Sequence, residues 1–194
     1  MPRQPDPDLE ERILKAAHAL WRRGGDKALT LRAVARAART NTPAVYRRFK
    51  DRHDLLRGLL LRVVNRFGKM FEAGTLEEIV EIYVDYAIAE PHEYELFYTY
   101  VHELSPKKGP GRPRPIRESR PNFGLLERRL AERLGGVPDD HTSLAIALWL
   151  VAHGAATFLL QKAIPEGHEE EVRSAARAAV KALLDGAARF QECK

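Results

Sequence analysis

Apolar residues recur at helical spacing along almost the whole of this 194-residue chain. Between Leu9 and Leu20, for example, apolar side chains return every three or four residues, which places them on one face of a helix. No segment shows the strict alternation of apolar and polar residues that is typical of a half-buried strand. The sequence therefore predicts an all-α fold.

Capping residues and helix breakers divide this pattern into separate helices. Gly24 and Gly25 can end the first helix. Thr30, Asn41 and Asp51 can each cap the start of a later one, because their side chains can accept a hydrogen bond from the backbone of the first turn. Further helices are expected from Thr75, from Pro91, over Asn122–Leu134, over Asp140–Ala163 and from about Val172 onward.

The net charge of +5 is unevenly distributed along the chain. Residues 1–55 hold 13 Lys and Arg against 7 Asp and Glu, and residues 105–121 hold six against one, so the remainder is acidic. Such asymmetry indicates a module that binds a polyanion, joined to a body that does not. We expect a DNA-binding domain over residues 1–52 and a second helical domain over 53–194, with the proline-rich basic segment 105–121 as a mobile loop.

The single cysteine, Cys193, excludes a disulfide within the chain and argues against a cysteine-based zinc site. The N-terminus lacks the apolar region of a secretory signal. The longest apolar run, Leu144–Leu160, is slightly short for a membrane span and contains His153. We therefore expect a cytoplasmic protein with no cofactor, no metal and no membrane partner.

Residues 30–49 fit a helix-turn-helix, two short helices joined by a tight turn at residues 39–41. Val45 and Phe49 form the inward pair of the second helix, which leaves short side chains, a tyrosine and two arginines facing outward. Arginine can bind guanine in the major groove, small side chains can contact a thymine methyl group, and tyrosine and lysine can hold phosphate oxygens. The candidate DNA-binding residues are Thr30, Arg32, Thr42, Pro43, Ala44, Tyr46, Arg47, Arg48, Lys50 and Arg52.

Four stretches match the sequence pattern of a known protein family: RILKAA at 12–17, LTLRAVA at 29–35, PAVYRRFKDR at 43–52 and LL at 55–56. Through these four stretches, residues 8–60 resemble the DNA-binding domain of the tetracycline-repressor (TetR) family. The resemblance implies that Arg32 and the short second helix touch bases, whereas Tyr46 and Arg52 contact the DNA backbone. Arg39 stands where this family usually has glycine, so we expect a left-handed arginine at a cost of about 1 kcal/mol.

The segment WLVAHG at 149–154 resembles the Trp-His-Gly signature of one class of C-terminal domains in the same family. Trp149 and His153 are four residues apart and share a helical face. Gly154 inside a helix costs about 1 kcal/mol relative to alanine, which indicates close packing or a nearby ligand.

The resemblance further implies a homodimer formed through the last two helices, and a small-molecule effector bound within the second domain. A dimer also suits DNA recognition, because two copies about 34 Å apart can read a palindrome. The resulting hypothesis is a repressor that an unidentified effector releases from its operator. Candidate effector-binding residues are Phe67, Phe71, Tyr86, Tyr98, His102, Trp149 and His153.

Three alternatives remain open. The same fold can act on DNA without an effector, as an architectural or division regulator. A metal enzyme could use His92, Glu93, Glu95, His102 and Glu103. However, the first three scatter around a helix, and no His-Glu-x-x-His motif, nucleophile elbow or phosphate loop occurs. The Gly-Arg-Pro within residues 107–115 resembles the core of an AT-hook, although a mobile basic loop is the simpler interpretation.

Overall fold

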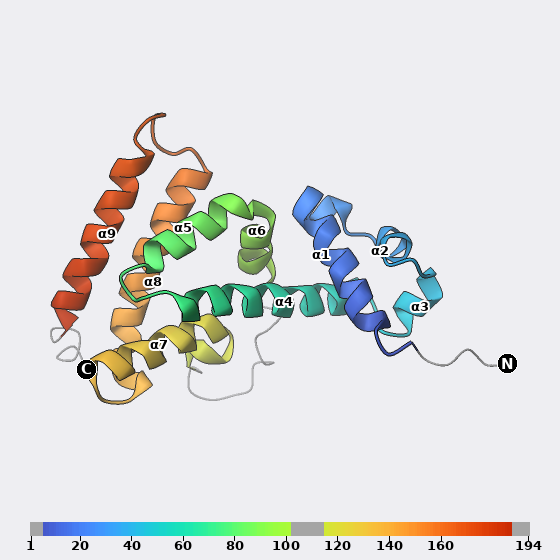
Figure 1. Ribbon diagram of the computed structural model, residues 1–194, viewed down its shortest axis with the longest axis horizontal. Helices are drawn as coiled ribbons and strands as arrows, with labels where there is room; N and C mark the ends of the chain where they lie inside the picture. Colours follow the sequence, from blue (N-terminus) through green and yellow to red (C-terminus); the bar gives the residue numbers. More distant parts are fainter. Residues whose placement is uncertain (1–5, 102–114, 188–194) are drawn as a thin grey trace, which may run out of the picture. The chain divides into compact units, whose positions relative to one another are not determined.

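The computed structural model of the protein describes residues 6–101 and 115–187. Within these ranges the regular elements are helices, and none is a strand, which confirms the predicted all-α class. Two short 3-10 turns, Ile116–Glu118 and Pro138–His141, accompany the α-helices of Figure 1: α1 (Leu9–Ala28), α2 (Leu31–Ala37), α3 (Thr42–Tyr46), α4 (Arg52–Ala73), α5 (Ile79–Ala89), α6 (Pro91–Tyr100), α7 (Pro121–Leu134), α8 (Thr142–Leu160) and α9 (Glu169–Asp185).

The described residues form two compact units. The first unit lies within Met1–Val63 and His92–Leu104, and the second lies within Val64–Pro91 and Ser105–Lys194. Helix α4 therefore begins in the first unit and ends in the second, and α6 belongs to the first unit although α5 belongs to the second.

The core of the first unit is built from the residues that the helical pattern predicts. Ile13 and Ala17 of α1, Val34 of α2, Val45 of α3 and Phe49 are buried, as expected from their spacing. Trp21 adds a large aromatic side chain to this core and is 1% exposed.

Helix α1 loses its regular geometry at the two glycines where the sequence predicts the helix to end. Gly24 and Gly25 have non-helical backbone angles, and a short helical turn continues to Ala28. Gly25 has a φ of 56°, and a Cβ atom there would lie 3.1 Å from Nδ1 of His92 in α6. A side chain at position 25 would therefore be strained by both the backbone conformation and the close approach of α6.

The predicted caps form around the helix-turn-helix. The backbone N–H of Ala33 donates to Oγ1 of Thr30 at 3.1 Å, and that of Ala44 donates to Oδ1 of Asn41 at 2.9 Å. Arg39 takes a φ of 52°, so the predicted left-handed arginine is present in the turn. These contacts set the start of α2 and α3 and the sharp turn between them.

In the second unit, α8 packs against α5 on one side and α9 on another. Leu144, Leu148 and Ala152 face the chain's own core, but Leu150 is 62% exposed and Phe158 is 54% exposed. The sequence is apolar nearly all round this helix, so the single chain leaves part of its apolar surface exposed. A helix that is apolar all round can be covered on some sides by its own chain and on others by a second molecule.

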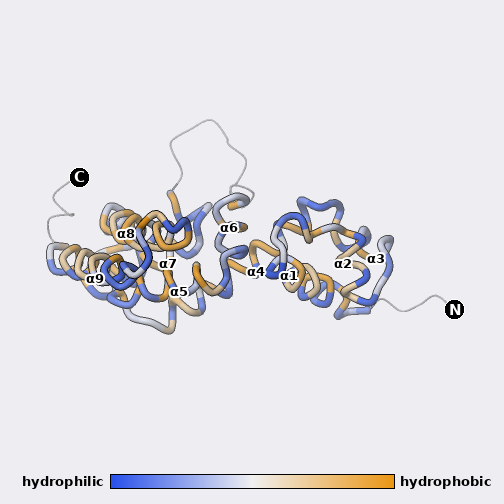
Figure 2. The backbone as a smooth tube through the Cα atoms, turned by 90° about the horizontal axis from the view of Figure 1, so that it is seen from above, coloured by the Kyte–Doolittle hydropathy of each residue, from blue (hydrophilic) through white to orange (hydrophobic). Residues whose placement is uncertain are grey.

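Figure 2 shows α8 as largely hydrophobic. The helical stretch Pro138–Leu160 is long and apolar enough to span a membrane by length and composition alone, and about a third of its apolar window is buried within the chain. This helical stretch is longer than the apolar run Leu144–Leu160 of the sequence, because it includes the 3-10 turn Pro138–His141 that precedes α8.

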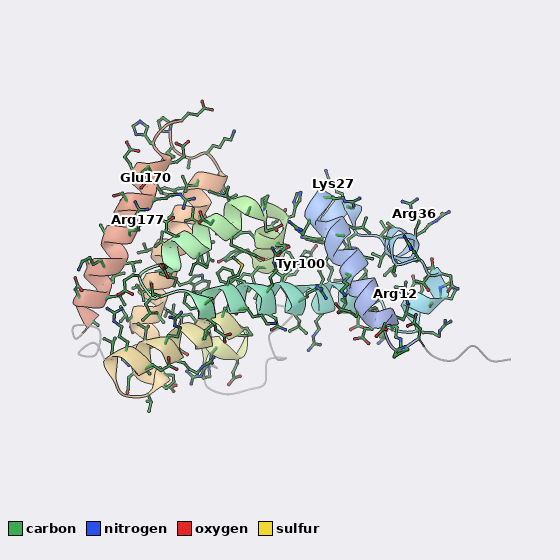
Figure 3. All side chains as sticks on the ribbon, in the orientation of Figure 1. Arg12, Lys27, Arg36, Tyr100, Glu170 and Arg177 are labelled. Atoms are coloured by element: carbon green, nitrogen blue, oxygen red, sulfur yellow. The ribbon has the colours of Figure 1, made fainter. Side chains whose placement is uncertain are left out.

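Ion pairs join α9 to α5. Arg173 binds Glu81 and Asp85, and Arg177 binds Glu81 together with Glu170 of its own helix (Figure 3). These pairs fix the charged side of α9 to α5, so the alanine-rich side of α9 is turned away from it.

Candidate nucleic-acid interface and effector site

Basic side chains line the outer side of α2 and the segments on either side of α3. Arg32, Arg36 and Arg39 are exposed along α2 and the turn, and Arg36 projects away from its helix in Figure 3. Tyr46 is 53% exposed and is followed by the exposed Arg47. Both helices bury their opposite faces in the core of the first unit, which leaves these side chains exposed among the described residues.

Most of the ten predicted DNA-binding side chains lie at the surface of the first unit. Thr42 and Arg52 are half-buried, and the exposed ones are Thr30, Arg32, Pro43, Tyr46, Arg47, Arg48 and Lys50.

Ala44 is a correction to the sequence prediction, because its side chain is only 4% exposed. Ala44 and Val45 are consecutive residues of a five-residue helix, and both turn toward the core. The prediction assigned the inward face to Val45 and Phe49 alone, whereas so short a helix buries a wider arc. Ala44 is therefore a packing residue that lets α3 approach its neighbours closely.

Asp6, the first residue that the structure describes, contacts Arg48, which follows α3. Nη2 of Arg48 donates to the backbone carbonyl of Asp6 at 3.1 Å. The carboxylate of Asp6 binds Arg12 of α1, which is labelled in Figure 3, and this hydrogen bond lowers the pKa of Asp6 below its ordinary value. Asp6 is thereby held next to the basic surface.

Arg52 does not point freely into solvent. Its Nε donates to the carbonyl of Leu29 at 3.2 Å, and its Nη2 lies 2.6 Å from Oδ1 of Asp26. The hydroxyl of Tyr100, labelled in Figure 3, donates to the same Oδ1 at 2.7 Å. Sequence reasoning missed Asp26 and Tyr100, because no local spacing connects positions 26, 52 and 100.

The residues considered for a metal enzyme hold α6 against α1. Nε1 of Trp21 donates to the backbone carbonyl of His92 at 2.6 Å, and Nε2 of His18 lies 2.6 Å from Oε1 of the fully buried Glu93. Nδ1 of His92 pairs with Glu95 at 3.7 Å. In the ranges that the structure describes, no three His, Cys, Asp or Glu side chains gather to hold a metal ion.

The second unit contains an aromatic cluster, formed by Phe67, Tyr83, Tyr86, Trp149 and His153. The ring centroid of Phe67 lies 5.5 Å from that of Tyr83 and 4.9 Å from that of Tyr86. His153 lies 6.3 Å from Tyr83 and 6.5 Å from Trp149, ring to ring. Nε1 of Trp149 donates to the hydroxyl of Tyr83 at 3.1 Å.

Four of the seven predicted effector residues, Phe67, Tyr86, Trp149 and His153, thus share this cluster, and Tyr83 was not among the seven. Burial lowers the pKa of His153 below its ordinary value of 6.5, which favours a neutral imidazole at pH 7.

The other three predicted effector residues lie elsewhere. Phe71 is buried in the second unit under the guanidinium of Arg129, 5.5 Å from the ring centroid. Tyr98 belongs to the first unit, and its ring lies tilted against that of Tyr94 of the same helix, with centroids 4.8 Å apart. His102 and residues 107–114 of the AT-hook-like segment lie outside the described residues.

Two family models match the chain. Residues 13–59 match the model described as bacterial regulatory proteins of the tetR family, and residues 76–183 match that of the tetracyclin repressor-like C-terminal domain. The chain belongs to the TetR family. The two matches cover the helix-turn-helix and most of the second unit.

Solved structures share the fold of this TetR-family chain. The multidrug binding protein EbrR, in complex with imidazole, is 20% identical with a TM-score of 0.66, over 94% of this chain and 93% of its own. A TetR-family member from Streptomyces coelicolor A3 is 20% identical with a TM-score of 0.62, over 91% and 98%. A Rhodococcus protein of unknown function is 21% identical with a TM-score of 0.66, over 96% and 98%. No curated protein matches the chain.

The protein is thus a TetR-family transcriptional regulator with a helix-turn-helix DNA-binding fold. Regulators of this family act by binding DNA, which is a different class of activity from the enzyme considered above. The finer assignment to the Trp-His-Gly class stays a prediction.

Proposed function

We propose that this TetR-family regulator binds a palindromic operator as a cytoplasmic homodimer and represses transcription until a small molecule releases it. The observation that carries the proposal is the exposed basic surface of α2 and α3, placed on a helix-turn-helix whose caps and turn are all formed. A short exposed helix with adjacent arginines suits the major groove.

Some of the proposed contacts are made to bases and others to phosphates. Arg47 and Arg32 supply guanidinium groups for guanine, and Thr42 and Pro43 supply small surfaces for neighbouring bases. Phosphate oxygens are held by side chains that fix the register of the protein on the duplex without reading its sequence. These phosphate-binding side chains are Thr30, Tyr46, Arg48 and Lys50.

The proposed dimer forms through α8 and α9. On α8, Leu150 and Phe158 expose large apolar surfaces, and a Cβ atom at Gly154 would meet none of the described residues within 4 Å. On α9, Ala178 and Ala182 are exposed on the side away from the ion pairs with α5. A second copy would bury this apolar surface, and the small residues let two helices approach closely.

The proposed effector site is the aromatic cluster of the second unit. Its rings suit an apolar or planar compound, and the neutral His153 can offer one donor or acceptor to it. The similarly folded EbrR is described as a multidrug binding protein and was solved with imidazole, a planar aromatic molecule. Phe71, Tyr98 and His102 remain further candidates for effector binding.

Selection of bound fragments from a random pool of duplex DNA tests the proposal. A palindrome with half-sites about one helical turn apart should emerge. Arg47→Ala should then lose about 1–3 kcal/mol of preference at one position in each half-site. Salt-dependent binding without any selected sequence would contradict the operator and favour an architectural role.

A further inference from the structure

The guanidinium of Arg52 bridges the turn that leads into the DNA-binding surface. Its Nε binds the carbonyl of Leu29 at 3.2 Å, and its Nη2 binds the carbonyl and the carboxylate of Asp26 at 3.3 and 2.6 Å. One side chain from the first turn of α4 therefore joins the end of α1 to Leu29, two residues before the start of α2. The backbone N–H of Leu29 also donates to the carbonyl of Asp26, at 3.2 Å, so the turn itself is closed.

Two proposed DNA contacts follow this turn directly. Thr30 comes next after Leu29 and caps α2 through its hydrogen bond with the amide of Ala33. Arg32 lies in the first turn of α2. A displacement of the carbonyl of Leu29 would shift both side chains, because one residue separates Leu29 from the start of the helix.

Asp26 keeps the guanidinium on the turn, and Tyr100 keeps Asp26 in place. The hydroxyl of Tyr100 donates to the oxygen that receives Arg52, and the Tyr100 ring packs edge-on against the buried Trp21, with centroids 6.0 Å apart. Hydrogen bonds from Arg52 and then Tyr100 hold the pKa of Asp26 below its ordinary range, so the carboxylate is charged at pH 7. Two of the three guanidinium nitrogens are thereby directed at the protein.

We propose that Arg52 is a positioning residue for operator binding, which holds the turn between α1 and α2 so that Thr30 and Arg32 meet the DNA. The inference rests on the proposed function, and it departs from the role that the family resemblance implies, a direct grip on the DNA backbone. Asp26 and Tyr100 belong to the same device, which we call the Arg52 buckle (Asp26, Arg52 and Tyr100).

The sign of the effect of Asp26→Asn separates the two roles. If Arg52 were a phosphate contact, removing its acidic partner would free the guanidinium and lower the repulsion of DNA, so affinity would stay equal or rise. The buckle predicts the opposite, roughly tenfold weaker binding, because the turn loses its charged hydrogen bond. Glu10→Gln removes the same charge from another exposed position of α1 and should leave affinity within about twofold of wild type.

The salt dependence of operator binding gives an independent measurement. A lost phosphate contact lowers the slope of log affinity against log salt by about 0.9, and a symmetric dimer counts it twice. Arg52→Gln should weaken binding with an unchanged slope, whereas Lys50→Gln, which alters an exposed lysine, should reduce the slope. A reduced slope for Arg52→Gln would overturn the buckle.

Hydrogen exchange in the DNA-free protein tests the buckle without the operator. The amides of Leu29 and Ala33 should exchange faster in Asp26→Asn and in Tyr100→Phe, which keeps the ring and removes only the hydroxyl, whereas the amide of Val45 should not change. Wild-type exchange at Leu29 and Ala33 in both variants would refute the buckle. If the wild-type protein selected no DNA sequence while these amides responded, the proposed function would fail and the buckle would stand as a structural device.

Discussion

Arg39 occupies the left-handed region of backbone space in the turn between α2 and α3, with a φ of 52°. An L-residue pays about 1–2 kcal/mol for this conformation, whereas glycine adopts it freely. The side chain itself is exposed on the basic surface. Compared with glycine, Arg39 therefore destabilises the turn but adds a positive charge to the surface that is proposed to bind DNA.

Arg39→Gly should raise the free energy of unfolding by about 0.5–1 kcal/mol, because the strain disappears while glycine adds some chain entropy. Arg39→Ala keeps the strain and loses the same guanidinium. Both variants should bind the operator more weakly than wild type and to a similar extent. Chemical unfolding of the three proteins would contradict this account if the glycine variant were no more stable than the alanine variant.

His153 makes the second unit sensitive to acid. Because burial lowers the pKa of His153 in the folded state, the unfolded chain takes up a proton more readily as the pH falls below 6.5. Stability is therefore complete above that pH and decreases as the pH falls toward the folded pKa. The decrease should be smaller in His153→Asn, which cannot take up this proton.

Fluorescence can follow this loss unit by unit, because Trp21 lies in the first unit and Trp149 in the second. In a Trp21→Phe background, urea unfolding at pH 7.5 and 5.5 reports on Trp149 alone. An equal drop in stability with and without His153 would show that other groups cause the acid sensitivity.

At the scale of the element, α3 depends on its cap more than the longer helices do. It has five residues, and one side-chain cap, from Oδ1 of Asn41 to the amide of Ala44, begins it. A helix this short has little stability of its own, so the cap and the buried side chains hold it in shape.

Asn41→Ala should destabilise the first unit by about 1 kcal/mol and weaken operator binding, because the first turn of α3 loses its acceptor. Asn41→Asp keeps the acceptor and adds a negative charge beside the basic surface. It should therefore retain stability but bind DNA weakly, as measured by thermal unfolding and anisotropy titration. Normal operator binding by Asn41→Asp would place α3 away from the phosphates.

Elements whose chemistry is local could be predicted from the sequence. The caps at Thr30 and Asn41, the glycine break in α1 and the left-handed Arg39 depend on residues within a few positions of one another. The buckle and the buried Glu93 could not be predicted, since their partners are 26 to 75 residues away and no periodicity connects them. Ala44 was misplaced because the arc buried by a short helix depends on neighbours that the sequence does not specify.

At the scale of the whole molecule, the apolar surface of α8 is the feature that the single chain leaves unexplained. The sequence of α8 is apolar nearly all round, and although α5 and α9 pack against it, Leu150 and Phe158 remain exposed. Leu150→Arg should convert the proposed dimer to a folded monomer and reduce operator affinity, because two half-sites are no longer bound together. Ile88→Arg alters an apolar residue of α5 that is similarly exposed and should leave the dimer intact.

Sedimentation velocity distinguishes these outcomes, and circular dichroism confirms that each variant is folded. A dimer that survives Leu150→Arg would move the proposed interface away from this face of α8.

The central claim is that two copies of α3 lie in successive major grooves of one duplex. Methylation interference measures it directly, because methylation of guanine N7 adds a group inside the major groove where Arg47 is proposed to bind. Premethylated guanines in two positions about one helical turn apart should block binding by the wild-type protein, and Arg47→Ala should relieve the block at one guanine in each half-site. Binding that tolerates methylation at every guanine of the selected operator would contradict the account.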